Sequence, residues 1–385
     1  MKILQISKYY YPHLGGIENH VYILSTELTR QNNDVTVIAS SNNKKFELKK
    51  INGAKIIKFP KFFEIFNAPV SPDLLFKSNL DYDIVHIHLP NPFTSLLVLF
   101  KKTKNLIVTY HSDIIKFGFL KKILNFLYTK LILTKILKRA KKIIVTTPNY
   151  VEGSPIIKKF KKKIVTVPLG IDISSFKLNV KKNQKFHKLK KKHLGKKILL
   201  FVGRLVPYKG LPYLIYAMKK VTQKFPEIKL FIIGEGPQRE NLKSLVNFLD
   251  ISDNIQFLGE VSSQDLPIYY NLCDIFILPS TYKAEAFGIV QLEAMACQKP
   301  VISTNIPGSG VSFVNTSNET GIIVKPKDVK ELVDAIIYLL KNEDVRKKLG
   351  KNAFKKVKNT FNKDIMTKNI LDVYGLVDRL WKIKK

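Results

Sequence analysis

Glu285 and Glu293 lie eight positions apart, in a stretch that follows the apolar run Ile275 to Leu278. Polar Ser280 and Thr281 stand between, and this order predicts a strand, a loop and then a helix. On one continuous helix eight residues rise about 12 Å, so two carboxylates at this spacing do not share one small atom. They would instead hold the two ends of an elongated ligand, with free backbone N–H groups at the helix start between them. A nucleotide-sugar has that form. The alternative is that both glutamates simply suit a helix dipole, so other motifs must decide.

A basic loop provides the next candidate. Arg204 and Lys209 lie between Gly203 and Gly210, directly after the predicted strand Ile198–Val202. Ligands of open α/β sheets bind beyond the carboxyl ends of the strands, where this pair would neutralise a diphosphate. Each charge-assisted hydrogen bond would contribute about 1.5–3 kcal/mol. A solvated basic loop is the alternative, but the flanking glycines permit close backbone approach and favour the phosphate.

Two further glycine motifs follow predicted strands. Gly234-Glu235-Gly236 begins like the dinucleotide fingerprint G-x-G-x-x-G, but Arg239 stands at the third glycine position. The fingerprint is incomplete, which disfavours a dehydrogenase. Near the N-terminus, Gly15-Gly16 opens a predicted helix and forms a second place where backbone can approach an anion.

The histidines divide into one functional candidate and two structural ones. His111 follows the predicted strand Leu106–Tyr110, with Asp113 two positions on, and we expect it at a ligand site. His86 and His88 share one face of their strand, which permits a metal pair. No third ligand is apparent, so we expect both to be structural and predict no metal site. The Asp81-Tyr82-Asp83 motif precedes its strand, which argues against a metal–diphosphate site.

Short apolar runs alternate with helical stretches, which predicts parallel α/β sheets in two similar units. The join lies in the turn-rich stretch Pro168–Asp172, so we expect domains at 1–168 and 169–363. The predicted strands of the first unit are Lys2–Ser7, Val35–Ala39, Ile84–His88, Leu106–Tyr110, Lys142–Thr146 and Ile164–Val167. Those of the second are Ile198–Val202, Lys229–Ile233, Ile255–Leu258, Ile275–Leu278, Val301–Ser303 and Gly321–Val324, followed by a helix over Val329–Lys341.

Composition describes a globular chain with an extreme charge. The 385 residues are 45% hydrophobic and contain two cysteines, Cys273 and Cys297, with no disulfide or zinc pattern. No signal peptide and no apolar run of about 20 residues is visible, so we expect a cytoplasmic protein. The net charge is +35, and residues 101–163 hold 17 basic against 2 acidic side chains. Residues 177–197 add ten lysines and no acid.

Three interpretations of this charge stay open: codon bias, an anionic membrane surface, or nucleic acid. No nucleic-acid-binding motif is present, which disfavours the last. The membrane interpretation has one specific support. From Phe117 to Leu137, apolar residues are interleaved with Lys121, Lys122, Lys130 and Lys135, as in a helix that lies at a headgroup surface. The lysines do not fall on one face, so part of this helix would be core.

These motifs, taken in order, resemble the retaining glycosyltransferases of family 4, which have the GT-B fold of two Rossmann-like α/β domains facing across a cleft. The resemblance covers nearly the whole chain. Each motif alone is weak, but the ordered set is highly specific. The set comprises Gly15-Gly16, Thr109-Tyr110-His111, Val167 to Asp172, Gly203-Arg204, Lys209-Gly210, Gly234 to Pro237, Glu285 to Gly288 and Glu293 to Ala296.

The resemblance implies a donor site in the second unit. Arg204 and Lys209 match the diphosphate-binding pair of the family, Gly234 lies in a matching donor-side loop, and Glu293 matches the carboxylate that binds the ribose hydroxyls. The resemblance also implies that the last helix, at about 364–385, returns to the N-terminal unit, which would be the acceptor side.

The same resemblance implies the reacting groups. Glu285 matches the residue that contacts the donor sugar, with the N–H groups of Phe287 and Gly288 near sugar and phosphate. His111 matches a residue beside the reacting sugar, so we take His111 and Glu285 as the catalytic candidates. Gly15-Gly16 matches the loop near donor phosphate and acceptor.

We therefore expect a retaining transferase that moves a hexose from a UDP- or GDP-linked sugar to a glycan acceptor in cell-surface polysaccharide or glycolipid synthesis. The acceptor would be lipid-linked, the similarity favours a mannose-type donor, and no cofactor or metal is expected. The protein would be cytoplasmic, or peripheral at the inner face of the membrane, with no nucleic-acid partner. Two rivals stay open: a nucleotide-sugar 2-epimerase of similar architecture, and an inactive nucleotide-sugar or nucleic-acid binder.

Overall fold

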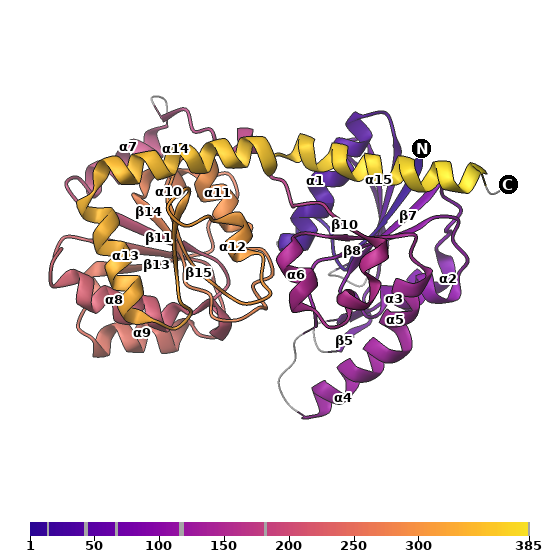
Figure 1. Cartoon of the computed structure of the whole chain (residues 1–385), viewed down its shortest axis with the longest axis horizontal. Coiled ribbons are helices and arrows are strands. Elements are labelled where there is room, and N and C mark those ends of the chain that lie inside the picture. Colours follow the sequence, from indigo (N-terminus) through magenta and orange to yellow (C-terminus); the bar gives the residue numbers. More distant parts are fainter. Residues whose placement is uncertain (14, 42–44, 66–67, 115–118, 181–182, 384–385) are drawn as a thin grey trace. The chain divides into compact units, whose positions relative to one another are not determined.

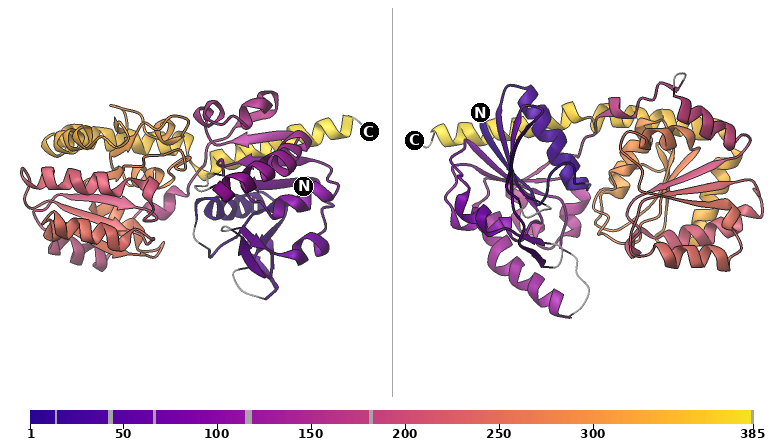
Figure 2. Two further views of the ribbon diagram at one scale, coloured as in Figure 1. Left: turned by 90° about the horizontal axis from the view of Figure 1, so that it is seen from below. Right: turned by 180° about the vertical axis from the view of Figure 1, so that it is seen from behind.

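The computed structural model describes residues 1–13, 15–41, 45–65, 68–114, 119–180 and 183–383, except the side chains of 119–122 and 380–383. It divides into two compact units (Figure 1). Unit 1 comprises Met1–Gly170 and Lys363–Lys385, and unit 2 comprises Ile171–Asn362. In each unit, helices cover both faces of a twisted sheet (Figure 2).

Unit 1 is built on an eight-stranded sheet with the order β10-β9-β8-β7-β1-β2-β4-β3. All neighbouring strands are parallel except β3 and β4, which form an antiparallel hairpin at one edge. The strands are β1 (Lys2–Ile6), β2 (Asp34–Ser40), β3 (Glu47–Ile51), β4 (Ala54–Phe59), β7 (Ile84–Leu89), β8 (Leu106–Tyr110), β9 (Lys142–Val145) and β10 (Ile164–Thr166). A separate hairpin joins β5 (Phe63–Ile65) and β6 (Ala68–Val70).

The last helix of the chain completes the core of unit 1. Helix α15 (Lys363–Ile383) packs against α1 (Gly16–Arg30), as Figure 1 shows. Its buried residues recur every three or four positions, which places them on one stripe facing the core. They are Met366, Ile370, Val373, Tyr374 and Val377. The remaining helices of the unit are α2 (Pro72–Lys77), α3 (Thr94–Phe100), α4 (Phe119–Tyr128), α5 (Thr134–Arg139) and α6 (Pro148–Gly153).

Unit 2 has a six-stranded, fully parallel sheet with the order β13-β12-β11-β14-β15-β16. The strands are β11 (Ile198–Val202), β12 (Lys229–Ile233), β13 (Ile255–Gly259), β14 (Ile275–Leu278), β15 (Val301–Thr304) and β16 (Gly321–Val324). The helices are α7 (Gln184–Lys192), α8 (Leu211–Thr222), α9 (Arg239–Phe248), α10 (Leu266–Leu272), α11 (Val290–Ala296), α12 (Val311–Val314), α13 (Val329–Lys341) and α14 (Glu343–Thr360).

Each sheet reverses its strand order once. In unit 2 the chain winds outward from β11 to β13, returns, and winds the other way from β14 to β16. In unit 1 the reversal falls between β1 and β7. At such a switch point the two following loops separate, and the crevice beyond the carboxyl ends of the strands binds ligands. The fold therefore provides one crevice of this kind in each unit.

The predicted apolar helix at 117–137 is three consecutive segments. Phe117 and Gly118 lie outside the described residues, and α4 is followed by a π-helical turn (Thr129–Leu133) and α5. None of the helices in the described part of the chain combines the length and apolar composition that a membrane-spanning helix needs. The basic run 177–197, of which 181 and 182 are not described, contains α7.

The packing of α15 predicts a matched pair of stability effects. Ile370 is 1% exposed, whereas Leu376 on the same helix is 43% exposed. Ile370→Ala should lower the free energy of unfolding by about 2–5 kcal/mol, because it removes buried methyl groups and leaves a cavity. Leu376→Ala should change it little. Thermal and denaturant unfolding of both variants measures this, and equal effects would mean that α15 is not part of the core.

Candidate active site

The switch point of unit 2 brings two of the predicted loops together. The loop after β11 carries residues 203–210, and the loop after the neighbouring strand β14 carries residues 279–289. The Thr281 N–H donates a 2.7 Å hydrogen bond to the Tyr208 carbonyl and joins the two loops directly. The predicted basic loop and the predicted carboxylate loop therefore lie side by side beyond the carboxyl ends of β11 and β14.

Lys209 and Glu285 form a buried ion pair at this junction. The Lys209 Nζ lies 2.6 Å from Glu285 Oε2, and the Ser280 hydroxyl donates a 2.9 Å hydrogen bond to the same carboxylate oxygen. Both residues are under 9% exposed. Burial alone would lower the pKa of Lys209, but the adjacent Glu285 carboxylate raises it, so the ammonium stays charged. The lysine expected to bind phosphate is thus paired with the carboxylate expected to bind sugar.

Glycine is required where these loops touch. Gly210 has φ +72°, and a Cβ there would lie 2.0 Å from the Pro279 carbonyl oxygen. Gly234, after β12, has φ +129°, and a Cβ there would lie 2.1 Å from the Gly203 carbonyl oxygen. Both positions therefore combine a conformation that favours glycine with a backbone contact that excludes any side chain. These glycines let three strand-end loops pack against one another.

Glu285 is not on the helix that carries Glu293, because the helix begins between the two residues. Helix α11 starts at Val290, and Gly288 adopts the left-handed conformation with φ +73°, which interrupts any helix there. Glu285 lies in the preceding loop, where Ser309 Oγ donates to its carbonyl and the Gly310 N–H donates to the Ala286 carbonyl. The loop is therefore held by hydrogen bonds from outside the helix.

The same loop contains two backbone N–H groups that are not paired with any described residue. Among the described residues, none accepts a hydrogen bond from the N–H of Phe287 or Gly288, although both residues are buried. Buried backbone N–H groups are nearly always paired, so two adjacent unpaired groups indicate a place for a ligand acceptor. Arg204 lies in the loop after β11 and is exposed, and its guanidinium makes no hydrogen bond or ion pair with another described residue.

Glu293 lies in the first turn of α11 and is partly buried. The Tyr270 hydroxyl donates a 2.6 Å hydrogen bond to its Oε2. Burial raises the pKa of Glu293 to about 7, although the Tyr270 hydrogen bond by itself lowers this pKa. One carboxylate oxygen is thus fixed by Tyr270, and sequence reasoning gave no signal for this partner.

In unit 1 four histidines gather at the sheet. His86 and His88 lie on β7, His111 directly follows β8, and His20 comes from α1. All four are buried, and burial lowers the pKa of each, with the neighbouring imidazoles adding to the effect for His86, His88 and His111. All four rings are therefore uncharged at neutral pH. The sequence shows no third ligand for His86 and His88, but the structure places His20 and His111 beside His88.

A hydrogen-bond chain fixes the protonation of His111. The side-chain amide oxygen of Gln5, Oε1, lies 2.7 Å from His88 Nε2 and can only accept a hydrogen bond. His88 therefore carries its proton on Nε2. His88 Nδ1 is then an acceptor, and His111 Nε2, 3.2 Å away, donates to it. The Gln5 amide in turn donates to the Tyr374 hydroxyl of α15 at 2.9 Å. The last helix thus holds the chain that orients His111.

The nitrogens of His20, His88 and His111 lie within 4.8 Å of one another, close enough to hold a metal ion. Both ring nitrogens of His20 are buried without a hydrogen-bond partner in the described structure. The 3.2 Å contact between His88 and His111 is explained by the proton that they share. This hydrogen bond accounts for the positions of His88 and His111, whereas it leaves both ring nitrogens of His20 unexplained.

Two other predicted residues have clear positions. The Asp113 carboxylate accepts hydrogen bonds from the Tyr110 hydroxyl at 2.8 Å and from the Ser154 hydroxyl at 2.7 Å, which ties it to the unit 1 framework. Gly15 is the residue before α1, and Gly16 is the first residue of that helix. Both lie beyond the carboxyl end of β1, on the switch-point side of unit 1.

Comparison with known proteins identifies the family. The profile of "Glycosyltransferase Family 4" matches residues 14–175, and that of "Glycosyl transferases group 1" matches residues 182–356. The O-antigen chain mannosyltransferase C of Escherichia coli is 31% identical over 379 residues, which cover 97% of this chain and 98% of that protein. The chain belongs to glycosyltransferase family 4. It is a glycosyltransferase of the group 1 type.

Solved structures show the same fold. Sucrose-phosphate synthase from Thermosynechococcus elongatus superposes with a TM-score of 0.80 at 21% identity, covering 97% of this chain and 98% of that one. Anabaena HepE in complex with UDP-glucose gives a TM-score of 0.77 at 16% identity, covering 97% and 99%. Two Rossmann-like units with this topology constitute the GT-B fold, so the expected fold class is confirmed.

The raised pKa of Glu293 predicts a pH-dependent stability of this glycosyltransferase. Between pH 4.5 and about 7 the folded protein holds a proton on Glu293 that the unfolded chain has lost. The free energy of unfolding therefore falls as the pH rises through this window. Glu293→Gln cannot ionise and should escape this loss. Its melting temperature should match the parent near pH 4.5 and exceed it at pH 8.

Exposed Glu260 offers a control, because Glu260→Gln should give no pH-dependent difference. A melting-temperature difference for Glu293→Gln that stays constant from pH 4.5 to 8 would contradict the assignment.

Proposed function

We propose that this glycosyltransferase retains anomeric configuration and transfers a hexose from a UDP- or GDP-linked sugar to a glycan acceptor. The observation that carries the proposal is the crevice in unit 2, where the Lys209–Glu285 pair adjoins the unpaired N–H groups of Phe287 and Gly288. A cation, a carboxylate and two backbone donors at one strand-end junction complement a phosphorylated sugar. The E. coli relative, a mannosyltransferase of O-antigen chains, supports a mannose-type donor and a role in polysaccharide synthesis.

The proposed donor site assigns one ligand group to each residue. Arg204, which is exposed, and Lys209, which is buried, would bind the diphosphate. The N–H groups of Phe287 and Gly288 would bind the phosphate or sugar oxygens. Glu293 would accept hydrogen bonds from the ribose hydroxyls with the oxygen that Tyr270 leaves free. When a phosphate takes the Lys209 ammonium, Glu285 becomes available to a sugar hydroxyl. Gly234 contributes close backbone approach, since no side chain fits there.

The reaction follows from these groups. The C1–O bond to phosphate breaks, the leaving nucleoside diphosphate keeps the electron pair, and the acceptor oxygen forms a bond to C1. The acceptor proton passes to a phosphate oxygen on the same face, which gives retention without a protein nucleophile. Arg204 and Lys209 stabilise the charge that grows on the diphosphate, as preorganised electrostatics requires. His111, held by His88, would lie beside the reacting sugar.

Glu285 and Asp113 are each held by partners within their own unit. Glu285 is bound to Lys209 and Ser280, and Asp113 accepts from Tyr110 and Ser154. This supports same-face attack by the acceptor. The epimerase alternative needs no acceptor, so it predicts conversion of the donor alone. The binding-only alternative predicts neither transfer nor donor hydrolysis.

Arg204→Ala tests the donor site without disturbing the fold. Because Arg204 is exposed and unpaired with other described residues, its removal should leave the melting temperature unchanged. It should weaken nucleoside diphosphate binding about tenfold or more, the effect of one charge-assisted bond. Calorimetric titration with UDP and GDP measures this. Lys220→Ala, an exposed lysine on α8, controls for the loss of one positive charge.

Lys209 needs a different variant, because removing it alone leaves the Glu285 carboxylate buried and unpaired, which destabilises strongly. The double variant Lys209→Met/Glu285→Gln removes both charges together. It should stay folded and lose most transfer activity. Full nucleotide affinity in Arg204→Ala, together with full activity in the double variant, would refute the donor-site assignment.

We further propose that an anionic membrane surface binds unit 1 and supplies a lipid-linked acceptor. Large apolar side chains on α4 and the following turn are exposed, among them Phe126 at 62% and Leu131 at 51%. Lys130 and Lys135 are exposed nearby, and Lys130 Nζ lies over the Phe126 ring at 5.8 Å from its centroid. Apolar side chains with adjacent ammonium groups suit a layer of acidic headgroups.

Vesicle flotation tests this surface. The protein should float with anionic vesicles, weakly at high salt, and Lys130→Glu/Lys135→Glu should lose most binding, since each lysine contributes about 1 kcal/mol. Phe126→Ser should also weaken binding, whereas Phe248→Ser, at an 84% exposed position in unit 2, should not. Equal binding to neutral and anionic vesicles would contradict the proposal.

A further inference from the structure

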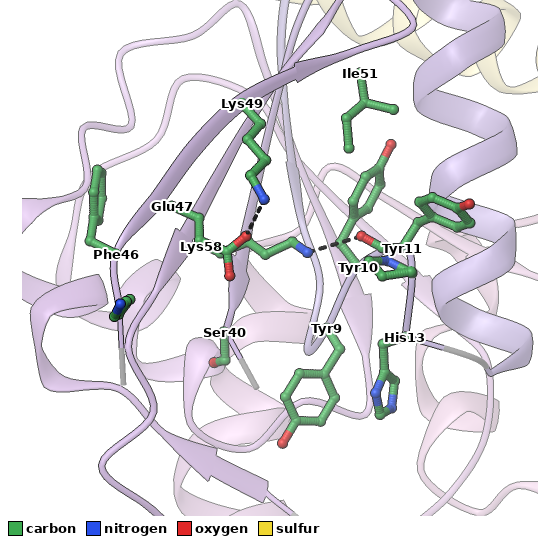
Figure 3. A pocket seen from close by; sticks show the side chains of 12 residues that line it. Tyr9, Tyr10, Tyr11, His13, Ser40, Phe46, Glu47, Lys49, Ile51 and Lys58 are labelled. Carbon is green, nitrogen blue, oxygen red and sulfur yellow. Dashed lines mark hydrogen bonds and ion pairs between the residues drawn. The ribbon is translucent and has the colours of Figure 1, made fainter. Parts of the chain in front are cut away.

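Unit 1 contains a cavity of about 530 Å³ that no residue of the proposed donor site lines. Figure 3 shows it between the loop after β1 and the β3–β4 edge of the sheet. Its volume falls within the roughly 300–1,000 Å³ of small-molecule sites. It lies at the carboxyl ends of β2 and β4, where Ser40 is the last residue of one strand and Lys58 precedes the last of the other. Ligands of parallel sheets bind at such ends.

One wall of the cavity is aromatic. Tyr9 and His13 have ring centroids 4.4 Å apart, and both line the cavity together with Tyr11. Tyr9 is buried, whereas Tyr11 stacks on Tyr22 at 4.8 Å between ring centroids and is still 46% exposed, so part of the Tyr11 ring is open to a ligand. The C–H face of a sugar ring packs well on such aromatic surfaces.

The opposite wall carries the charge. Residues Glu47, Lys49 and Ile51 alternate along β3 and so share the face toward the cavity. Lys45 and Lys58 also line it, which sets three lysines against one carboxylate. That carboxylate is occupied, since Glu47 lies 3.1 Å from Lys49 Nζ and accepts a 2.9 Å hydrogen bond from the Ser41 hydroxyl. The cavity wall therefore has an excess of positive charge.

Lys58 indicates that the ligand of this cavity is negatively charged. Its side chain is only 9% exposed and reaches across the cavity, where the ammonium donates a 2.9 Å hydrogen bond to the Tyr11 carbonyl (Figure 3). That is its one hydrogen bond among the described residues, so two of its three N–H groups remain to be satisfied. Burial lowers the pKa of Lys58, with Glu47 acting against this. A buried ammonium without a direct carboxylate partner is costly, and an anionic ligand would offset that cost.

We propose that this cavity binds a sugar that bears an anionic group, with the sugar ring against Tyr11 and the anion on Lys58. The inference rests on the proposed transferase function, because it makes this sugar part of the acceptor. The loop that lines the cavity, from Tyr9 to His13, leads directly to Gly15-Gly16 before α1. The anion is a carboxylate of an acidic sugar or a phosphate next to the lipid carrier. Both are negatively charged and accept hydrogen bonds from the Lys58 ammonium.

Matched sugar pairs test the proposal without donor or activity. Methyl α-D-glucuronide and methyl α-D-glucoside differ only in the carboxylate, and α-D-glucose 1-phosphate represents the phosphate source. Binding is followed by protein chemical-shift changes in titrations of the whole chain. At least one anionic sugar should bind about tenfold more tightly than the neutral one, as one charge-assisted bond predicts. The tighter of the two anionic sugars identifies the source.

Variants at two lysines complete the test. Lys58→Met should abolish the preference for the anionic sugar, and Lys58→Arg should keep it. Lys50→Met is the control, because Lys50 lies on the opposite face of β3 from Lys49 and does not line the cavity. Melting temperatures establish that each variant is folded. If Lys58→Met proves unfolded, Lys58→Arg and the wild-type sugar pairs still decide the result.

The possible outcomes distinguish a failure of the cavity proposal from a failure of the proposed transferase function. No preference for either anionic sugar in the wild type, or a preference that survives in folded Lys58→Met, overturns the cavity proposal while nucleotide binding at Arg204 stands. Absence of nucleotide binding together with a Lys58-dependent preference overturns the transferase proposal and leaves the anionic-sugar site intact.

Discussion

The buried Lys209–Glu285 ion pair is the constraint around which unit 2 is arranged. Two charges at 2.6 Å in a buried setting are stable only if their remaining hydrogen-bonding groups are satisfied and their geometry is fixed. Ser280 satisfies the carboxylate, and Thr304 Oγ1 donates to the Ser280 carbonyl, so β15 supports the loop after β14. Gly210 allows the lysine loop to reach the carboxylate loop, because no side chain fits beside the Pro279 carbonyl. The pair therefore requires three neighbouring strands and one glycine.

The sequence predicts unit 2 well because four of its six strands, β11, β12, β14 and β15, lie inside the sheet and are almost wholly buried. The predicted bounds of β11, β12, β14 and β16 coincide with those observed. Such strands are continuous apolar runs, which periodicity detects easily. The β3–β4 hairpin was not predicted, because it lies at a sheet edge and alternates lysines with apolar residues. The first residue of α11 was not predicted for another reason, since one left-handed residue, Gly288, separates the helix from the loop before it.

The site residues also divide into those that the sequence predicts and those that only the structure shows. Motif residues such as Arg204 and Glu293 could be named from the sequence because their loops follow predicted strands. Their partners could not, since Tyr270 and Glu293 are 23 positions apart, and Gln5 and Tyr374 are 369 apart. A hydrogen bond between distant segments leaves no periodic pattern, and only the packing of α15 on unit 1 brings Tyr374 to the sheet. Sequence spacing locates the loops, whereas tertiary packing sets orientation and protonation.

The burial of individual lysines indicates function, whereas the net charge of the chain does not. With a net charge of +35, an exposed lysine carries little information about function. Among the described residues only two lysines are buried, Lys58 in unit 1 and Lys209 in unit 2. Both lie at the carboxyl ends of parallel strands, and burial disfavours the charged form of both. Lys209 has a carboxylate against it, whereas Lys58 has a backbone carbonyl. A carbonyl offsets less of the cost of burial than a carboxylate does, so Lys58 is the buried cation that a ligand anion would stabilise more.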